Sequence, residues 1–155
     1  MSRVQLALNV TDIDEAVDFY SRLFDTEPAK RKPGYANFAI TDPPLKLVLF
    51  EGPEGATLNH LGVETETASE VEAAEARLAT EGLDPSAVDD TVCCYASKVE
   101  TWVTDPDGAR WEWYVKTGDA DAPTDRAGDR DAGFLLHRLT RHAPRMVQAD
   151  RLRRR

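Results

Sequence analysis

The chain has 155 residues, a length that suits one domain or two small halves sharing a core. Hydrophobic residues make up 41% and charged residues 30%, and the net charge of −9 repels nucleic-acid phosphates from a folded body. Every apolar run is shorter than the ~20 residues of a membrane helix, and no signal-peptide region follows Met1, so we expect a cytoplasmic protein.

The first half of the chain predicts a strand, a helix and two further strands. Residues 4–10 partly alternate between apolar and polar, which places the even positions toward a core and Gln5 on the opposite face. Asp12, followed by Glu15, is typical of a capping box that begins a helix with one apolar face. After a turn at Lys32-Pro33-Gly34, two more strands are predicted at residues 35–40 and 45–50.

The second half predicts the same plan again. A strand, a helix and two strands are expected at residues 59–65, 68–81, 101–104 and 111–115. Gly82 ends the helix, and Asp105-Pro106-Asp107-Gly108 is a strong turn signal between the last two strands. The repeated order indicates an α+β domain over residues 1–116, with modules at about 1–55 and 56–116. Two such modules can place two curved sheets side by side around a cleft.

The composition changes after Lys116. Residues 117–155 hold nine Arg and six Asp, so this segment is basic while the body before it is acidic. Residues 117–132 have the composition of a linker, and we expect a linker followed by a disordered basic tail. A short amphipathic helix around 133–142, docked on the acidic body or on an anionic membrane surface, is the alternative.

Three polar residues on predicted strands are candidate metal ligands. Gln5, His60 and Glu112 can point into one cleft, because side chains alternate along a strand. One imidazole, one carboxylate and one amide oxygen form a facial set with open positions, related to the two-His-one-carboxylate set of non-haem Fe(II) enzymes. A lone His on a strand is more often an ordinary core or surface residue, so spacing alone leaves these roles open.

The only two cysteines, Cys93 and Cys94, are neighbours in the sequence. A disulfide between adjacent residues would link no distant parts of the chain, so these cysteines do not form a disulfide that stabilises the fold. They are either buried structural residues or a reactive pair that can chelate a soft centre such as zinc, copper(I), trivalent arsenic or cadmium. A closed four-cysteine zinc site is impossible within one chain.

Several motifs together resemble one protein family. Cys93-Cys94-Tyr95-Ala96 and Asp42-Pro43-Pro44-Leu45 are its most specific matches, whereas the turn at 105–108 marks only the superfamily. Arg3-Val4-Gln5 and Asn59-His60-Leu61-Gly62-Val63 extend the match, which covers about residues 1–118. The chain resembles the arsenic- and cadmium-resistance (ArsI/CadI) branch of the glyoxalase/bleomycin-resistance/dioxygenase superfamily.

This resemblance implies a fold, a reaction and a site. The fold is that of the vicinal oxygen chelate superfamily, in which two βαβββ modules form a cupped mixed sheet around a metal cleft. Family members of the lyase type are Fe(II)-dependent dioxygenases that cleave the carbon–arsenic bond of trivalent organoarsenicals, such as methylarsenite and reduced aromatic arsenicals, to give arsenite. By position, Gln5, His60 and Glu112 match the metal ligands, and Cys93 and Cys94 match the arsenic-binding pair. Expected partners are the organoarsenical and O2, with no nucleic acid or membrane span, in a monomer or homodimer.

One segment departs from the family pattern. Relatives commonly continue Cys-Cys-Tyr-Ala with a Gln-Asp-Lys run, but Glu100 holds the usual lysine position here and Lys98 lies two residues earlier. We expect residues 97–101 to belong to a mobile loop that carries the thiols, with Tyr95 and Lys98 as possible contributors to the site. A cadmium- or arsenite-binding protein without turnover, and another enzyme of the superfamily, remain the alternatives. The native metal also stays open, because Fe(II) is implied only by the resemblance.

Overall fold

The computed structural model describes residues 2–93 and 95–120. These residues form eight strands and two helices in the order strand, helix and three strands, twice over. The first set is β1 (Arg3–Val10), α1 (Ile13–Phe24), β2 (Lys30–Lys32), β3 (Tyr35–Ile40) and β4 (Leu45–Glu51). The second set is β5 (Thr57–Glu64), α2 (Ala68–Thr80), β6 (Asp89–Cys93), β7 (Ala96–Thr104) and β8 (Arg110–Asp119).

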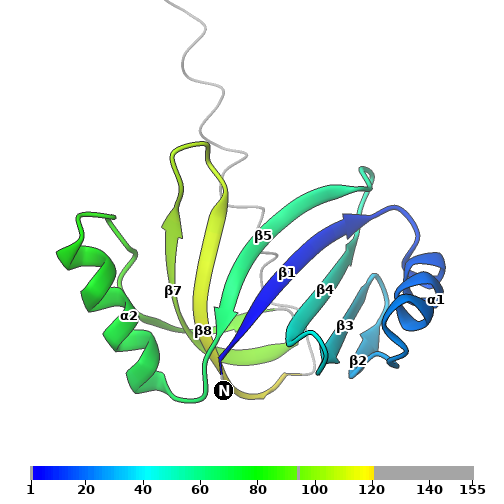
Figure 1. The fold of residues 1–155 in the computed structure, drawn as a ribbon, viewed down its shortest axis with the longest axis horizontal. Coiled ribbons are helices and arrows are strands. Elements are labelled where there is room, and N and C mark those ends of the chain that lie inside the picture. Colours follow the sequence, from blue (N-terminus) through cyan, green and yellow to red (C-terminus); the bar gives the residue numbers. More distant parts are fainter. Residues whose placement is uncertain (1, 94, 121–155) are drawn as a thin grey trace, which may run out of the picture.

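All eight strands join in one curled sheet with the order β2-β3-β4-β1-β5-β8-β7-β6. In each half, the first strand pairs in parallel with the last strand, β1 with β4 and β5 with β8. The two halves meet where β1 and β5 pair antiparallel. Figure 1 shows the sheet curving between α1 and α2, which lie at opposite ends of the molecule. The predicted α+β fold with two βαβββ modules is confirmed.

Both helices begin at a side-chain cap. Asp12 accepts hydrogen bonds from the backbone N–H groups of Asp14 and Glu15, and this cap starts α1 where the sequence predicted it. α2 begins with a complete capping box between Thr67 and Glu70, which the sequence analysis did not identify. The apolar face of each helix then packs on the strands of its own half, α1 on β3 and β4 and α2 on β7 and β8.

The alternation along β1 separates the core from the site. Leu6, Leu8 and Val10 pack against the core cluster that α1 covers, whereas Gln5 and Ala7 are buried on the other face. Val4 was expected to face the core with the other even positions, but 48% of it is exposed, because it lies outside the cluster that α1 covers. The face that carries Gln5 is therefore the inside of the curled sheet and not a solvated face.

Three segments differ from the sequence expectations. Residues 97–101 are not a loop, because they lie in β7 and pair on both sides with β6 and β8. Lys30–Lys32, next to the predicted turn, forms the short edge strand β2 against β3. β8 continues to Asp119, past the expected boundary at residue 116, because its last residues pair with β7. The rest of the predicted linker and tail, residues 121–155, lies outside the described residues. No helix within the described part is long and apolar enough to cross a membrane.

Candidate metal centre and its cavity

Gln5, His60 and Glu112 come together on three neighbouring strands at the centre of the sheet. They lie on β1, β5 and β8, and β5 pairs with both of the other strands. Gln5 Nε2 is 2.9 Å from His60 Nε2 and 3.0 Å from Glu112 Oε2, and the last two atoms are 3.5 Å apart. All three side chains are buried, with exposed fractions of 4%, 3% and 0%. The structure thus brings together the three residues that the sequence analysis singled out.

The spacing and chemistry of these three groups fit a divalent metal ion. Adjacent donor atoms about 2.1 Å from a six-coordinate ion lie about 3 Å from each other. Gln5 turns its amide nitrogen toward the other two groups, and a half-turn of the amide would place its oxygen there instead. Across residues 2–93 and 95–120, no three His, Cys, Asp or Glu side chains form a group that could hold a metal. A three-ligand site here therefore depends on the amide of Gln5.

A chain of hydrogen bonds fixes the imidazole of His60. Asn59 Oδ1 lies 2.7 Å from His60 Nδ1, and Asn59 in turn donates to Asn9 Oδ1 over 2.8 Å. Asn9 donates to the hydroxyl of Thr57 over 2.9 Å. Since Asn59 Oδ1 can only accept, the proton of His60 is assigned to Nδ1, which leaves the lone pair of Nε2 facing Gln5 and Glu112. This is the tautomer that a metal-binding imidazole needs.

Glu112 is a fully buried carboxylate that stays charged. Burial by itself raises the pKa of Glu112, but the ammonium of Lys98 outweighs it and holds the pKa far below its usual range. Lys98 Nζ donates to Glu112 Oε1, on the side of the carboxylate away from His60. Glu112 Oε2 is therefore the oxygen that faces the candidate metal position.

Lys98 and Glu100 form a charged pair behind the candidate ligands. Both residues are buried on β7, and Lys98 Nζ lies 3.4 Å from Glu100 Oε2. Burial and the neighbouring charge of Glu112 raise the pKa of Glu100. Trp102 Nε1 donates to the other oxygen of Glu100 over 3.0 Å. Lys98 therefore contacts Glu112 from the strand β7, and the prediction that Lys98 lies in a loop is wrong.

Tyr114 holds the amide of Gln5 from the other side. Its hydroxyl donates to Gln5 Oε1 over 2.5 Å, and its side chain is buried. Burial, together with the charges of Glu64 and Glu112, raises the pKa of the Tyr114 hydroxyl above its ordinary value, so Tyr114 remains a neutral donor. Nothing in the sequence pattern distinguishes Tyr114 from an ordinary aromatic core residue.

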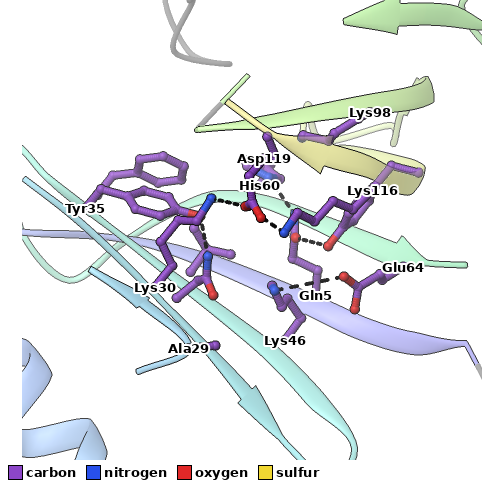
Figure 2. A pocket seen from close by; sticks show the side chains of 15 residues that line it. Gln5, Ala29, Lys30, Tyr35, Lys46, His60, Glu64, Lys98, Lys116 and Asp119 are labelled. Atoms are coloured by element: carbon purple, nitrogen blue, oxygen red, sulfur yellow. Dashed lines mark hydrogen bonds and ion pairs between the residues drawn. The ribbon is translucent and has the colours of Figure 1, made fainter. Parts of the chain in front are cut away.

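A cavity of about 180 Å³ opens beside Gln5 and His60 on the inside of the sheet. Its apolar side includes Val48, Phe50 and Tyr35. Its polar side is rich in lysine, and Figure 2 shows Lys30, Lys46 and Lys116 directed into the same space from three strands. The cavity exceeds the engineered site of about 150 Å³ that holds a benzene molecule in another protein, so a small organic molecule fits here.

The end of β6 at Cys93 and the start of β7 at Ala96 lie next to this cavity. β6 ends at Cys93, whose backbone pairs with Ala96, and Ala96 lines the cavity. Tyr95 has a positive φ of 64° in this turn, and its carbonyl accepts a hydrogen bond of 2.7 Å from Lys30. The ring of Tyr95 also contacts Tyr35, with centroids 5.4 Å apart. The side chain of Cys93 and all of Cys94 lie outside the described part of the chain.

The glyoxalase/bleomycin resistance protein/dioxygenase superfamily profile matches residues 3–113. The chain belongs to this superfamily. Among relatives within it, a cadmium-induced protein, CadI, from Mycobacterium tuberculosis is 59% identical over 122 residues, 78% of this chain and 80% of that protein. A trivalent organoarsenical cleaving enzyme from Thermomonospora curvata is 58% identical over 123 residues, 78% of this chain and 82% of that enzyme. The resemblance inferred from the motifs is confirmed.

A solved structure of the superfamily has the same fold. The Mn(II)-bound glyoxalase from Novosphingobium aromaticivorans superimposes with a TM-score of 0.56 at 20% identity, over 82% of this chain and 44% of that protein. At this identity the likeness concerns the curled sheet and its helices alone.

Proposed function

We propose that this superfamily member is an enzyme of arsenic detoxification that cleaves the carbon–arsenic bond of trivalent organoarsenicals and releases arsenite. The observation that carries the proposal is the convergence of Gln5, His60 and Glu112 beside a cavity that Ala96, the backbone partner of Cys93, lines. The 58% identity to a protein named as a trivalent organoarsenical cleaving enzyme supports the same reaction.

In this proposal, Gln5, His60 and Glu112 hold a ferrous ion. A bound ferrous ion would supply the redox chemistry with dioxygen that none of the protein's own side chains can supply. Asn59 orients His60, while the Tyr114 hydroxyl, which donates to Gln5 Oε1 here, would accept from Gln5 Nε2 after the half-turn of the amide. Burial excludes bulk water from the three ligands. The overall reaction balances without a further reductant for a methyl group. Methylarsenite and one dioxygen give formaldehyde and arsenous acid, with carbon losing the four electrons that dioxygen gains.

The thiols and the cavity position the substrate. Trivalent arsenic binds two thiolates strongly, and we assign this role to Cys93 and Cys94. The organic group enters the cavity beside Gln5 and His60, so that one cavity serves both the arsenic and the metal. Holding two reactants in one place supplies a large part of a catalytic advantage. The ring of Tyr95 contacts Tyr35, which lines the cavity.

A second function, stoichiometric binding of cadmium or arsenite without turnover, is favoured by one observation. Lys98 donates to Glu112 and places an ammonium next to this proposed metal ligand. The positive charge of the ammonium opposes the binding of a metal ion at Glu112, on which turnover depends. The 59% identity to a cadmium-induced protein is consistent with this alternative.

The deciding experiment loads the protein with Fe(II) without oxygen and then adds oxygen and methylarsenite, with arsenic speciation followed over time. An enzyme releases arsenite repeatedly and consumes one dioxygen for each arsenite formed. A binding protein instead stops after stoichiometric capture and consumes no oxygen. The double variant Cys93→Ser with Cys94→Ser is the control, and unchanged turnover in it would point to another enzyme of the superfamily.

A further inference from the structure

Nearly all the lysines of this acidic chain line the cavity. The chain has five lysines and a net charge of −9, and four of those lysines, at positions 30, 46, 98 and 116, line this one cavity. Among the described residues, only the carboxylates of Glu64 and Asp119 line it with them. A cavity meant for a neutral methylated arsenical has no need of such a concentration of cations.

Three of the four lysines have a close carboxylate partner. Lys30 donates to Asp119, Lys116 Nζ lies 2.8 Å from the same carboxylate, and Lys98 donates to Glu112. Asp119 links the edge strand β2 to the end of β8, and this contact gives Lys30 and Lys116 a structural role. Their presence alone therefore does not indicate a ligand.

Lys46 differs from the other three. Its side chain is 14% exposed, and its nearest carboxylate oxygen, Glu64 Oε1, is 3.9 Å away, which is too far for a hydrogen bond. The other oxygen of Glu64 accepts from Arg3, so one carboxylate is shared between two cations (Figure 2 marks its contact with Lys46). Within residues 2–93 and 95–120, the ammonium of Lys46 makes no hydrogen bond. Because Lys46 lines the cavity, its ammonium is available to a group bound there.

The charges around Lys46 favour the binding of an anion. Burial lowers the pKa of Lys46, the carboxylate of Glu64 raises it, and the charges of Arg3, Lys116 and Lys30 lower it further. A bound anion would offset both the burial and the repulsion among these cations.

We propose that Lys46, assisted by Lys116 and Lys30, binds a carboxylate on the organic part of the substrate. The substrate class is then trivalent organoarsenicals whose organic group carries a carboxylate, so this inference rests on the proposed function. Gln5 and Lys46 are register partners on the adjacent strands β1 and β4, and such strands are about 4.8 Å apart. A carboxylate only one or two carbons from the arsenic can therefore reach Lys46 while the arsenic stays near Gln5.

The reaction of such a substrate balances as it does for methylarsenite. Carboxymethylarsenite and one dioxygen give glyoxylate and arsenous acid, and no further reductant is needed. The carbon–arsenic bond breaks, carbon loses four electrons, dioxygen gains them and arsenic remains trivalent. Carboxymethylarsenite and methylarsenite thus form a matched pair that differs only in the carboxylate.

The first test compares kcat/KM for this pair in the wild-type protein and in Lys46→Met. We expect the wild type to prefer carboxymethylarsenite, and Lys46→Met to lose about tenfold to a hundredfold more activity toward it than toward methylarsenite. Lys46→Arg should keep most of the preference, because it keeps the charge. Arg22→Met, which removes an exposed cation on α1, is the control and should change neither value. No preference in the wild type, or equal losses in Lys46→Met, would overturn the inference.

The second test needs no turnover and therefore separates this inference from the proposed function. Benzoate, an arsenic-free carboxylate of suitable size, is titrated into wild type and Lys46→Met, and binding is followed by ligand-observed NMR. Binding that weakens in Lys46→Met and is retained in Lys46→Arg supports the carboxylate site, even if methylarsenite proves not to be a substrate. Absent binding, or equal binding in wild type and Lys46→Met, overturns the site even if methylarsenite is cleaved. Since Glu64 keeps Arg3 as a partner in both variants, we expect both to fold.

Discussion

Glu112 is the only carboxylate among the three candidate ligands, and its charge is what distinguishes this site from an ordinary polar network. Glu112→Gln keeps the size and most hydrogen bonds of the side chain but removes the charge. We expect metal affinity to fall by about a hundredfold or more, because even residues that only orient a ligand contribute ten- to a hundredfold. Anaerobic titration with Fe(II), followed calorimetrically, measures this loss. Glu64→Gln, which removes a carboxylate of the cavity away from His60, is the matched control, and an equal loss in both variants would contradict the assignment of Glu112.

At Gly62, the neighbouring strands that carry Gln5 and Glu112 come too close to leave room for a side chain. It lies between Gln5 and Glu112 in the strand register, and a Cβ there would be 3.0 Å from the carbonyl oxygen of Glu112 and 3.3 Å from Gln5 Cβ and Nε2. Gly62→Ala must push these strands or side chains apart. We expect a loss of about 1–3 kcal/mol in the free energy of unfolding and weaker metal binding, although every ligand is still present.

Urea unfolding and Fe(II) titration of the same Gly62→Ala preparation measure both effects. Gly52→Ala is the control, because nothing lies within 4 Å of a Cβ at that position. Wild-type metal affinity in Gly62→Ala would show that the three candidate ligands tolerate displacement, which a geometrically defined metal site does not.

At the residue scale, the sequence predicts identities better than interactions. Gln5, His60 and Glu112 could be singled out because each is a polar residue on a predicted strand and matches a family position. The need for Gly62, the donor Tyr114 and the unusual Lys46 could not be predicted. Their roles arise from which strands are neighbours, and residue spacing carries no such information.

The start of α2 depends on a carboxylate, so its stability depends on pH. Glu70 accepts hydrogen bonds from the backbone N–H groups of Glu66 and Thr67, and these bonds lower the pKa of Glu70 from 4.5. A group whose folded pKa is depressed stabilises the fold above its unfolded pKa and loses this contribution as the pH falls through the folded value. We therefore expect Glu70→Ala to destabilise the protein at neutral pH and to matter less well below pH 4.5.

Urea unfolding of wild type and Glu70→Ala across this range measures the effect. Glu72→Ala, on the same helix but outside the capping box, controls for the general charge of the helix. A difference between wild type and Glu70→Ala that persists unchanged under acid conditions would mean that Glu70 acts through packing and not through its charge.

At the element scale, the sequence predicted most helices and strands but not all boundaries. Periodicity and capping residues identify α1 and β3 within a residue or two, because their signals are local. The loop expected at residues 97–101 is a strand, although charged residues such as Lys98 and Glu100 are rare in buried strands. Both are accommodated in β7 because each has an oppositely charged partner inside the curled sheet.

At the scale of the whole molecule, the two halves meet at the candidate metal centre. Gln5 belongs to the first half, while His60 and Glu112 belong to the second. A second contact joins the halves farther away, where Lys30 of β2 donates to Asp119 of β8. The repeated strand–helix–strands order and the family resemblance predicted two modules around a metal cleft, but not the order of the strands in the sheet. The strand order β2-β3-β4-β1-β5-β8-β7-β6 rests on long-range pairing, which periodicity does not encode.

Because the proposed ligands come from both halves, metal binding should stabilise the whole fold and not one half. A ligand that binds only the folded state adds about 2.7 kcal/mol at a free concentration about a hundredfold above its Kd. For a domain of this size that corresponds to a rise in Tm on the order of 10 °C. We expect this rise on adding Fe(II) without oxygen, in a single cooperative transition that fluorescence and circular dichroism report at the same temperature.

Two variants test whether the rise in Tm comes from metal binding to ligands of both halves. Glu112→Gln should lose most of the metal-induced rise in Tm, because its second-half carboxylate no longer bears a charge. Gln5→Ala should do so as well, because the first half then offers no ligand to the ion and the metal no longer bridges β1 to β5 and β8. If Gln5→Ala keeps the full rise, the ion is held by the second half alone, and the amide of Gln5 is a neighbour of the metal and not a ligand.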